Sequence, residues 1–196
     1  MDGPDDSTSF PDSSSFVRTM VPNGGAHVST DESVFGGAAG EFSGTAYLQS
    51  TSNMSFGTGD FTVEGFVRFD TTADMGFLAG LNNAEMDFAF VGNEMRLGRL
   101  NTAWDSVFPF TRSTGIWYHV AWCREGTGLR AFVDGVQAGS TATNSTAYNA
   151  VSDFKIGAST GADRRFDGFI DEVRITAGVA RYTANFTPPA APFPNS

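Results

Sequence analysis

The acidic residues are the side chains of this sequence that could most readily do chemistry. Cleavage of a glycosidic bond needs two carboxyl groups held roughly 5 to 9.5 Å apart across the bond. Glu64 and Asp70 are too isolated to supply the clustered pair of acids that such a reaction needs. We therefore predict no catalytic residues and no enzyme.

The histidines and the cysteine also argue against catalysis. His27 and His119 are the only histidines, and His119 lies in the aromatic run 117–122, which is typical of a core imidazole rather than a general base. The single cysteine, Cys123, ends an apolar run and has no partner for an internal disulfide. It is predicted to be a buried, unreactive thiol.

The charge of the chain narrows the classes of partner. Twelve basic and 22 acidic residues give a net charge of -10 and a pI near 4.4, so the protein repels phosphate backbones and anionic lipid. Residues 1–10 lack the basic and apolar parts of a secretion signal, and no run of about 18 apolar residues exists. Nucleic acid and membrane insertion are not expected.

Short extended runs dominate the chain, at intervals of about ten residues. Apolar and polar residues alternate in several of them, and Gly92-Asn93 is typical of a tight hairpin turn. The fold class expected is all-β, a sandwich or barrel. The predicted strands are Phe42–Leu48, Phe61–Phe69, Met86–Val91, Met95–Leu100, Ile116–Arg124, Leu129–Val133, Phe154–Ile156 and Phe169–Ile175.

The whole chain, residues 1–196, is expected to form a single domain. Residues 1–40 are polar and irregular, and we expect them to join the domain as a first strand or arm. Residues 187–196 are rich in proline, which cannot donate to a sheet, so they should form an extended tail on this domain or on a partner.

Four stretches resemble the laminin G-like jelly rolls of the concanavalin A-like superfamily. They are Phe56–Glu64, Gly115–Ala121, Ala131–Gly135 and Phe166–Ile175. The resemblance implies a two-sheet antiparallel jelly-roll sandwich. The closing run 178–189 is similar to copies of this domain in bacteriophage structural proteins.

In similar family members an acid of the motif at 170–173, together with an N-terminal aspartate, holds a structural calcium ion. The matching residues here are Asp171 and Asp12, and oxygen ligands suit this hard cation. Asp171 shares the alternation face of Phe169, Val173 and Ile175, so its carboxylate is expected toward the core. The alternative is that Asp171 accepts backbone N–H bonds or pairs with Arg174 or Arg165.

Laminin G-like and lectin relatives bind sugars or proteins through loops at a sheet rim. The resemblance therefore implies ligand-binding candidates, of which Trp104 is either a stacking platform or an anchor tucked against the sandwich. The candidates are Asn82, Asn83, Trp104, Asp105 and Tyr148.

The function expected first is a non-enzymatic decoration or cement protein on the surface of a bacteriophage particle. Its partners would be capsid subunits, held by the N-terminal segment or the C-terminal tail, and a homo-oligomer is compatible with the sequence. The alternative is a tail-associated module that binds host surface glycans. A glycoside hydrolase or polysaccharide lyase is the remotest reading.

Overall fold

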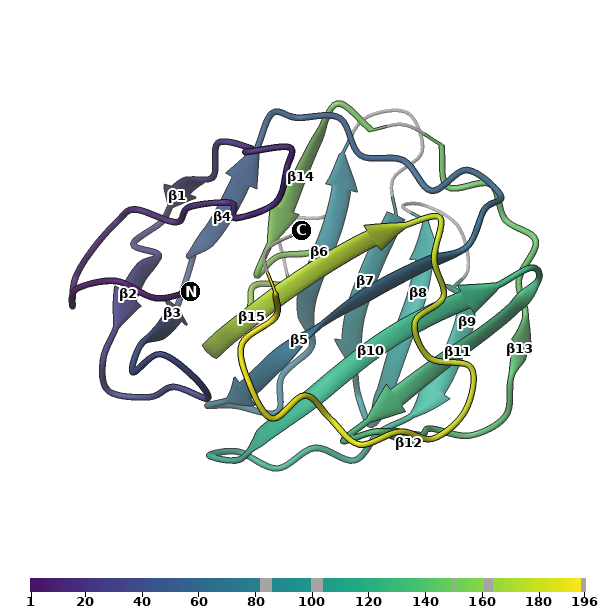
Figure 1. Cartoon of the computed structure of the whole chain (residues 1–196). Coiled ribbons are helices and arrows are strands. Elements are labelled where there is room, and N and C mark those ends of the chain that lie inside the picture. Colours follow the sequence, from purple (N-terminus) through teal and green to yellow (C-terminus); the bar gives the residue numbers. More distant parts are fainter. Residues whose placement is uncertain (82–85, 100–103, 150, 161–163, 195–196) are drawn as a thin grey trace.

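The computed structural model describes residues 1–81, 86–99, 104–149, 151–160 and 164–194. Two antiparallel β-sheets pack face to face in this part of the chain, which contains no helix (Figure 1). Accordingly, no helix of the described residues could cross a membrane. The protein is an all-β sandwich, as the strand pattern predicts.

Sheet A has seven strands. In spatial order they are β1 (Val21–Asn23), β4 (Tyr47–Ser50), β14 (Asp153–Ile156), β6 (Met75–Leu81), β7 (Met86–Val91), β8 (Glu94–Arg99) and β9 (Trp104–Pro109). Every neighbouring pair is antiparallel.

Sheet B has eight strands. Those on its main path are β12 (Val136–Gln137), β11 (Gly128–Val133), β10 (Trp117–Glu125), β5 (Phe61–Phe69), β15 (Gly168–Ala177), β3 (Ala39–Phe42) and β2 (His27–Ser29), and β13 (Ala142–Thr143) pairs with β11.

The core between the sheets is rich in aromatic side chains. Trp122 of β10 is fully buried and contacts Phe77, Phe88 and Phe90 from β6 and β7, with ring centroids 5.5–5.7 Å apart. Aromatic rings bury large apolar areas. The sandwich is therefore held together without a disulfide, and Cys123 is free and buried, as expected.

One predicted strand is wrong, and two strands were not predicted. The range Phe42–Leu48 is not one strand, because the chain turns between β3 and β4 and the two strands join different sheets. Strands β6 and β9 were not predicted: β6 contains two glycines, which hide its alternation, and Trp104 is the first residue of β9 and not part of a loop.

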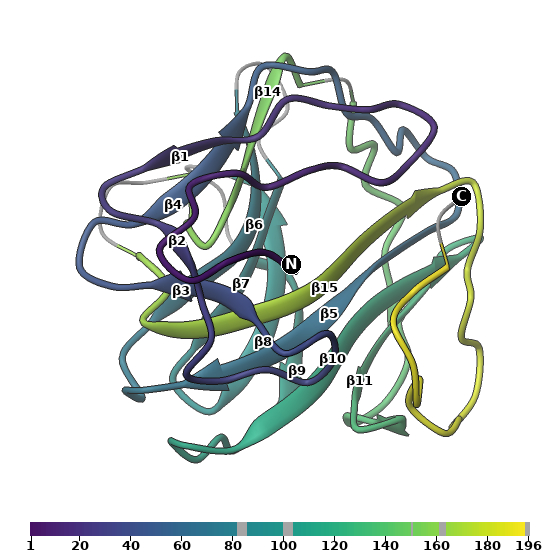
Figure 2. The ribbon, with the colours of Figure 1, turned by 60° about the vertical axis from the view of Figure 1, so that its left-hand side comes forward.

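Both ends of the chain pack on the sandwich. The N-terminal 40 residues supply β1 to sheet A and β2 to sheet B. Residues 178–194, here called the C-terminal cover, leave β15 and cross the outer face of β10 and β11 (Figures 1 and 2). The proline-rich tail thus docks on its own domain, which is one of the two arrangements that the sequence allowed.

Candidate functional site

Trp104 lies flat on the outer face of sheet A. It is paired in register with Gly98, which follows the core residue Leu97 and so points away from the core. A Cβ atom on Gly98 would stand only 2.8 Å from Cε3 of Trp104, so the indole passes directly over this glycine. The ring is partly exposed. It rests on the sheet instead of in the core.

The guanidinium groups of two arginines lie over this indole. The guanidinium carbon of Arg96 on β8 is 5.5 Å from the ring centroid, and that of Arg164 is 5.4 Å away. Arg164 comes from the connection between β14 and β15, which folds back onto sheet A over Gly76. A Cβ on Gly76 would clash with the backbone of Ser159 at 1.9 Å, so the approach requires glycine. Distant segments therefore assemble one surface.

Asp87 of β7 anchors the connection that carries Arg164. The hydroxyl of Ser159 donates to Oδ2 of Asp87, and Nη1 of Arg164 lies 3.8 Å from the same oxygen. Oδ1 is buried without a hydrogen-bond partner among the described residues. Burial raises the pKa of Asp87 to about 6, although Ser159 and Arg164 oppose the shift. We call Trp104, Gly98, Arg96, Arg164 and Asp87 the Trp104 face.

Asp105 and Tyr148 are joined to each other beside this face. The Tyr148 hydroxyl donates to Oδ2 of Asp105 over 3.2 Å, and Arg99 also pairs with that carboxylate at 3.2 Å. Tyr148 is fully buried, and burial raises the pKa of its hydroxyl. Its ring has no surface for a sugar, so the expectation that Tyr148 itself contacts a ligand is corrected: it positions Asp105.

Asn82 and Asn83 lie outside the described residues. The expectation that they bind a ligand stays a prediction.

Alternation in the sequence could have indicated Asp87 and Arg96, two residues of the Trp104 face that were not predicted. Alternation in β7 places Met86, Phe88 and Phe90 in the core, and consequently Asp87 on the outer face. Arg96 alternates in the same way with Met95 and Leu97. No local pattern indicates Arg164, because only the folding of its connection brings it to Trp104.

The surroundings of Asp171 do not fit the expected calcium ion. Its Oδ2 accepts N–H bonds from Val34 and Phe35 at 3.1 and 3.3 Å, and its Oδ1 accepts the amino group of Met1 and the N–H of Glu172, each at 2.9 Å. N–H donors therefore occupy both oxygens, whereas a calcium ion would need them as ligands.

Asp12, the other predicted ligand, has separate partners. Its two oxygens accept the backbone N–H groups of Ser14 and Arg18, each at 2.9 Å. Although burial acts to raise the pKa of Asp12, these bonds hold it below its usual value. Within the described part of the chain no three acidic, histidine or cysteine residues group as metal ligands. The contacts match the alternative of backbone bonding, and calcium binding stays a prediction.

The position of Asp171 also differs from the expected one. The register of β15 against β5 shifts between Asp171 and Arg174, and Glu172 has a φ of 50°. This bulge breaks the alternation, so Asp171 shares the outer face with its partner Phe66, while Val173 beyond the bulge packs against the core. Asp171 is buried because N-terminal residues cover it.

Buried arginines hold loops by their backbone carbonyls. The Arg124 side chain is fully buried and donates to the carbonyl oxygens of Gly57, Gly59 and Thr146 at 2.6–3.0 Å. Arg112 holds three other carbonyls in the same way. A planar guanidinium with five donors can do this, and a lysine ammonium cannot.

A second charged cluster lies on the outer face of sheet B. Glu64 of β5 accepts hydrogen bonds from Arg174 (2.8 Å), from the Tyr182 hydroxyl (2.9 Å) and across 3.1 Å from Nε2 of His119. Burial opposes its ionisation, but His119, Arg174 and Tyr182 together hold the pKa of Glu64 below its usual value. His119 is buried, as predicted, although outside the core between the sheets.

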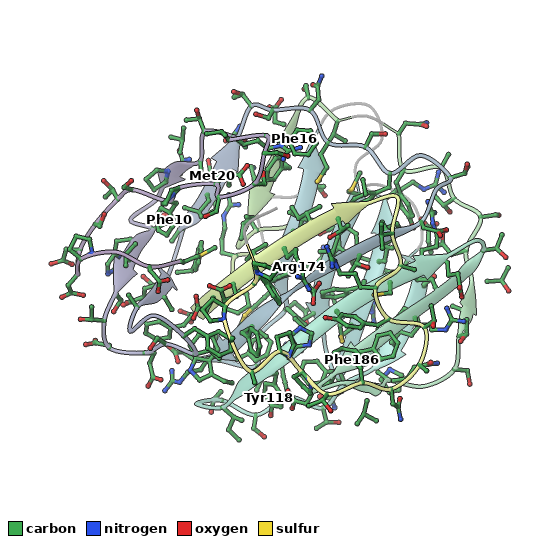
Figure 3. The ribbon with its side chains drawn as sticks, in the orientation of Figure 1. Phe10, Phe16, Met20, Tyr118, Arg174 and Phe186 are labelled. Carbon is green, nitrogen blue, oxygen red and sulfur yellow. The ribbon has the colours of Figure 1, made fainter. Side chains whose placement is uncertain are left out.

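The C-terminal cover closes this second face. Tyr182 and Phe186 stack at a centroid distance of 3.5 Å, and Phe186 packs on Phe132 and His119. Phe193 lies 3.9 Å from the guanidinium of Arg174. Arg174 of β15 and Phe186 of the cover are both labelled in Figure 3. Glu64 and His119 are therefore buried from solvent beneath the cover.

Glu64 and Asp70 do not form a catalytic pair in this arrangement. Glu64 lies inside β5 and Asp70 just after its end, and six residues of extended chain span about 20 Å. Asp70 pairs instead with Arg68 at 2.6 Å. The separation exceeds what either mechanism of glycoside hydrolysis uses.

Residues 42–180 match the family described as the concanavalin A-like lectin/glucanases superfamily, Laminin G 3. The match spans well over half of the chain. This protein belongs to that superfamily. The comparison with curated proteins finds no match.

Solved structures of this superfamily fold include enzymes and binding domains. Domain 4 of AbnA, an extracellular arabinanase of Geobacillus stearothermophilus, in complex with arabinotriose, has a TM-score of 0.64 at 19% identity, covering 84% of each chain. A structure of botulinum neurotoxin type C, whose cell entry depends on interaction with two ganglioside molecules, has a TM-score of 0.65 at 13% identity, covering 88% of this chain and 47% of its own. A Trypanosoma rangeli sialidase mutant has a TM-score of 0.50 at 18% identity, covering 77% of this chain and 27% of its own. At these identities the likeness shows the fold.

Proposed function

We propose that this protein is a non-enzymatic carbohydrate-binding module whose Trp104 face stacks on a sugar ring. The observation that carries the proposal is the partly exposed indole of Trp104, which lies against Gly98 and has the guanidinium groups of Arg96 and Arg164 over its ring. Aromatic faces bind the apolar faces of sugar rings, and neighbouring polar groups bind the hydroxyls.

A shallow groove next to Arg96 lies between the turn that joins β7 to β8 and strand β9. Residues that line it include Val91, Glu94, Val107 and Pro109. An open face of this kind suits a chain of sugars better than an enclosed small molecule. The structural neighbours that bind arabinotriose or interact with gangliosides support a glycan partner.

The test is retention on immobilised polysaccharides of the wild type and Trp104→Ala. We expect Trp104→Ala to lose retention while its melting temperature changes little, because the ring lies outside the core. Trp117→Phe, a change on sheet B, serves as the matched aromatic control and should bind like the wild type. Equal retention of wild type and Trp104→Ala would contradict the proposal.

We propose as a second function the decoration of a bacteriophage particle, with the virion surface as its location. The observation that favours it is the exposed apolar tip Phe16-Val17, whose side chains are 72% and 74% accessible. Val17 has a φ of 45°, a conformation that a β-branched residue seldom adopts. Figure 3 shows Phe16 on a loop far from Phe186.

The decoration proposal is tested by adding the protein to capsids that lack it. Wild type should bind and Phe16→Ser with Val17→Ser should not, whereas Trp104→Ala should bind normally. Cryo-electron microscopy of the particle would then place the protein on the shell. Density at the tail tip alone would contradict decoration and favour host glycan recognition.

A further inference from the structure

We propose that the Trp104 face recognises an acidic sugar, a ring that carries a carboxylate or a sulfate, and that Arg164 binds the acidic group. This inference rests on the proposed carbohydrate-binding function and adds the class of sugar to it. It also assigns Asp87 as a positioning residue beneath the site.

The arginines around Trp104 differ in how well they are neutralised. Arg96 pairs with Glu94 at 2.6 Å, and Arg99 pairs with Asp105 at 3.2 Å. Arg164, in contrast, lies 3.8 Å from Asp87, the longest of the three pairs. Since the strength of an ion pair falls with distance, Arg164 is the least compensated of these cations.

Arg164 has donors to offer a ligand. Its contacts with Asp87 and with the Ser159 hydroxyl, at 3.8 and 3.4 Å, both involve Nη1. A guanidinium carries five N–H donors on three nitrogens and binds carboxylate or sulfate oxygens in pairs. Its guanidinium lies over the Trp104 ring, 5.4 Å from the centroid, so those donors are next to any sugar that contacts the indole.

Asp87 controls the charge that Arg164 presents. The side chain is 4% exposed and belongs to the layer under Arg164, so it positions the arginine and does not touch a ligand. Burial raises its pKa to about 6. Below that pH the carboxyl is neutral, and Arg164 loses its counter-charge. Groups that face Asp87 from adjacent elements are Ala79 on β6, Gly98 on β8, and Ser159, Thr160 and Arg164 on the connection.

The site therefore predicts tighter binding of acidic sugars at pH 5.5 than at pH 7.5. The net charge of -10 repels acidic polymers at long range, but the Debye length is about 8 Å at 0.15 M salt. Local contacts then decide the affinity.

The experiment measures affinity for two matched pairs of polymers in 0.15 M NaCl. Polygalacturonate is compared with its methyl ester, and dextran sulfate with dextran, so each pair shares its sugar backbone and differs in whether the substituent is charged. The variants are Arg164→Gln, Asp87→Asn and, as a control distant from the site, Arg130→Gln. Melting temperatures establish that each variant is folded.

We expect the wild type to prefer one acidic polymer over its neutral counterpart, and the pair that shows the preference identifies carboxylate or sulfate. Arg164→Gln should weaken acidic binding about tenfold, the loss of one charge-assisted contact, and leave neutral binding unchanged. Asp87→Asn should bind at pH 7.5 as tightly as the wild type does at pH 5.5, without pH dependence.

The outcomes separate the two proposals. If wild type and Arg164→Gln bind acidic and neutral polymers equally, while Trp104→Ala binds neither, the acidic-sugar inference is overturned and carbohydrate binding stands. If no binding depends on Trp104, the proposed function itself fails. If the acidic preference depends on Arg164 but is the same at both pH values, the role of Asp87 is overturned.

Discussion

The outer faces of the two sheets each bury a carboxylate, and the two carboxylates behave in opposite ways. Glu64 on sheet B is fully buried but has close bonds from Arg174, Tyr182 and His119, which keep its pKa low. Asp87 on sheet A is similarly buried, but Ser159, the distant guanidinium of Arg164 and Thr160 compensate less than burial does, so its pKa is raised. Partners, and not burial by itself, decide the charge.

The segments that cover the two outer faces also differ in how completely they pair the carboxylate beneath them. The C-terminal cover places aromatic rings on sheet B and completes the bonds of Glu64, which is a structural arrangement. The connection over sheet A leaves the indole of Trp104 partly exposed and Oδ1 of Asp87 without a partner among the described residues. Incomplete pairing at a surface is typical of a binding site.

The largest expected effect comes from removing the charge of Glu64. Glu64→Gln leaves Arg174 without its buried counter-ion, so we expect a loss of about 3–5 kcal/mol in the free energy of unfolding. Urea denaturation at pH 7 measures it. The control is Glu94→Gln on sheet A, whose partly exposed pair with Arg96 should contribute under about 1 kcal/mol. Equal losses of unfolding free energy in Glu64→Gln and Glu94→Gln would contradict the stronger pairing that we assign to Glu64.

A second prediction concerns pH. The pKa of Asp87 rises from 3.8 in the unfolded chain to about 6 in the fold, so the folded state holds its proton more tightly. Its contribution to stability is present below pH 3.8 and is lost as pH rises toward 6, by up to about 3 kcal/mol at 1.36 kcal/mol per pKa unit.

Asp87→Asn tests the direction in which Asp87 makes stability depend on pH. Its free energy of unfolding relative to wild type should increase between pH 4 and pH 6.5 and then level off, since asparagine does not ionise. Glu64 has the opposite linkage, because its lowered pKa contributes stability that is lost as pH falls. Asp70→Asn, an exposed change, is the control. A difference that is constant with pH would contradict the raised pKa of Asp87.

The third prediction addresses the cover on sheet B. Phe186→Ala removes a ring that packs on Phe132 and His119, and a partly buried ring of this kind is worth about 2 kcal/mol. Cys123 lies beneath the same segment, and burial raises its pKa to about 11. Labelling of Cys123 by a thiol reagent should therefore be faster in Phe186→Ala. Unchanged labelling would show that the cover does not shield it.

The smallest expected effect is that of calcium. Both oxygens of Asp171 already accept N–H bonds, so adding EDTA to the protein should not change its melting temperature by more than about 1 °C. A larger fall that calcium reverses, and that Asp171→Asn abolishes, would restore the ion that the family resemblance implies.

The abundance of arginine shows how tertiary contacts explain what composition leaves open. Eleven of the twelve basic residues are arginine, and Lys155 is the single lysine. Arg124 and Arg112 use the fork of the guanidinium to bind several carbonyls each. The counts alone give no reason for this preference, because it depends on where loops meet.

The sequence by itself determined the strands that alternate strongly, such as Phe61–Phe69 and Met86–Val91, and the sandwich that they build. Periodicity is a local property, so it can be read from neighbouring residues. Only the tertiary structure decided that Gly98 lies under Trp104, that Arg164 reaches the same indole, and that Phe66, the residue that breaks the alternation of its strand, packs under Phe193 of the cover. These contacts join segments far apart in the chain, and their pairing depends on register and packing, which no local pattern encodes.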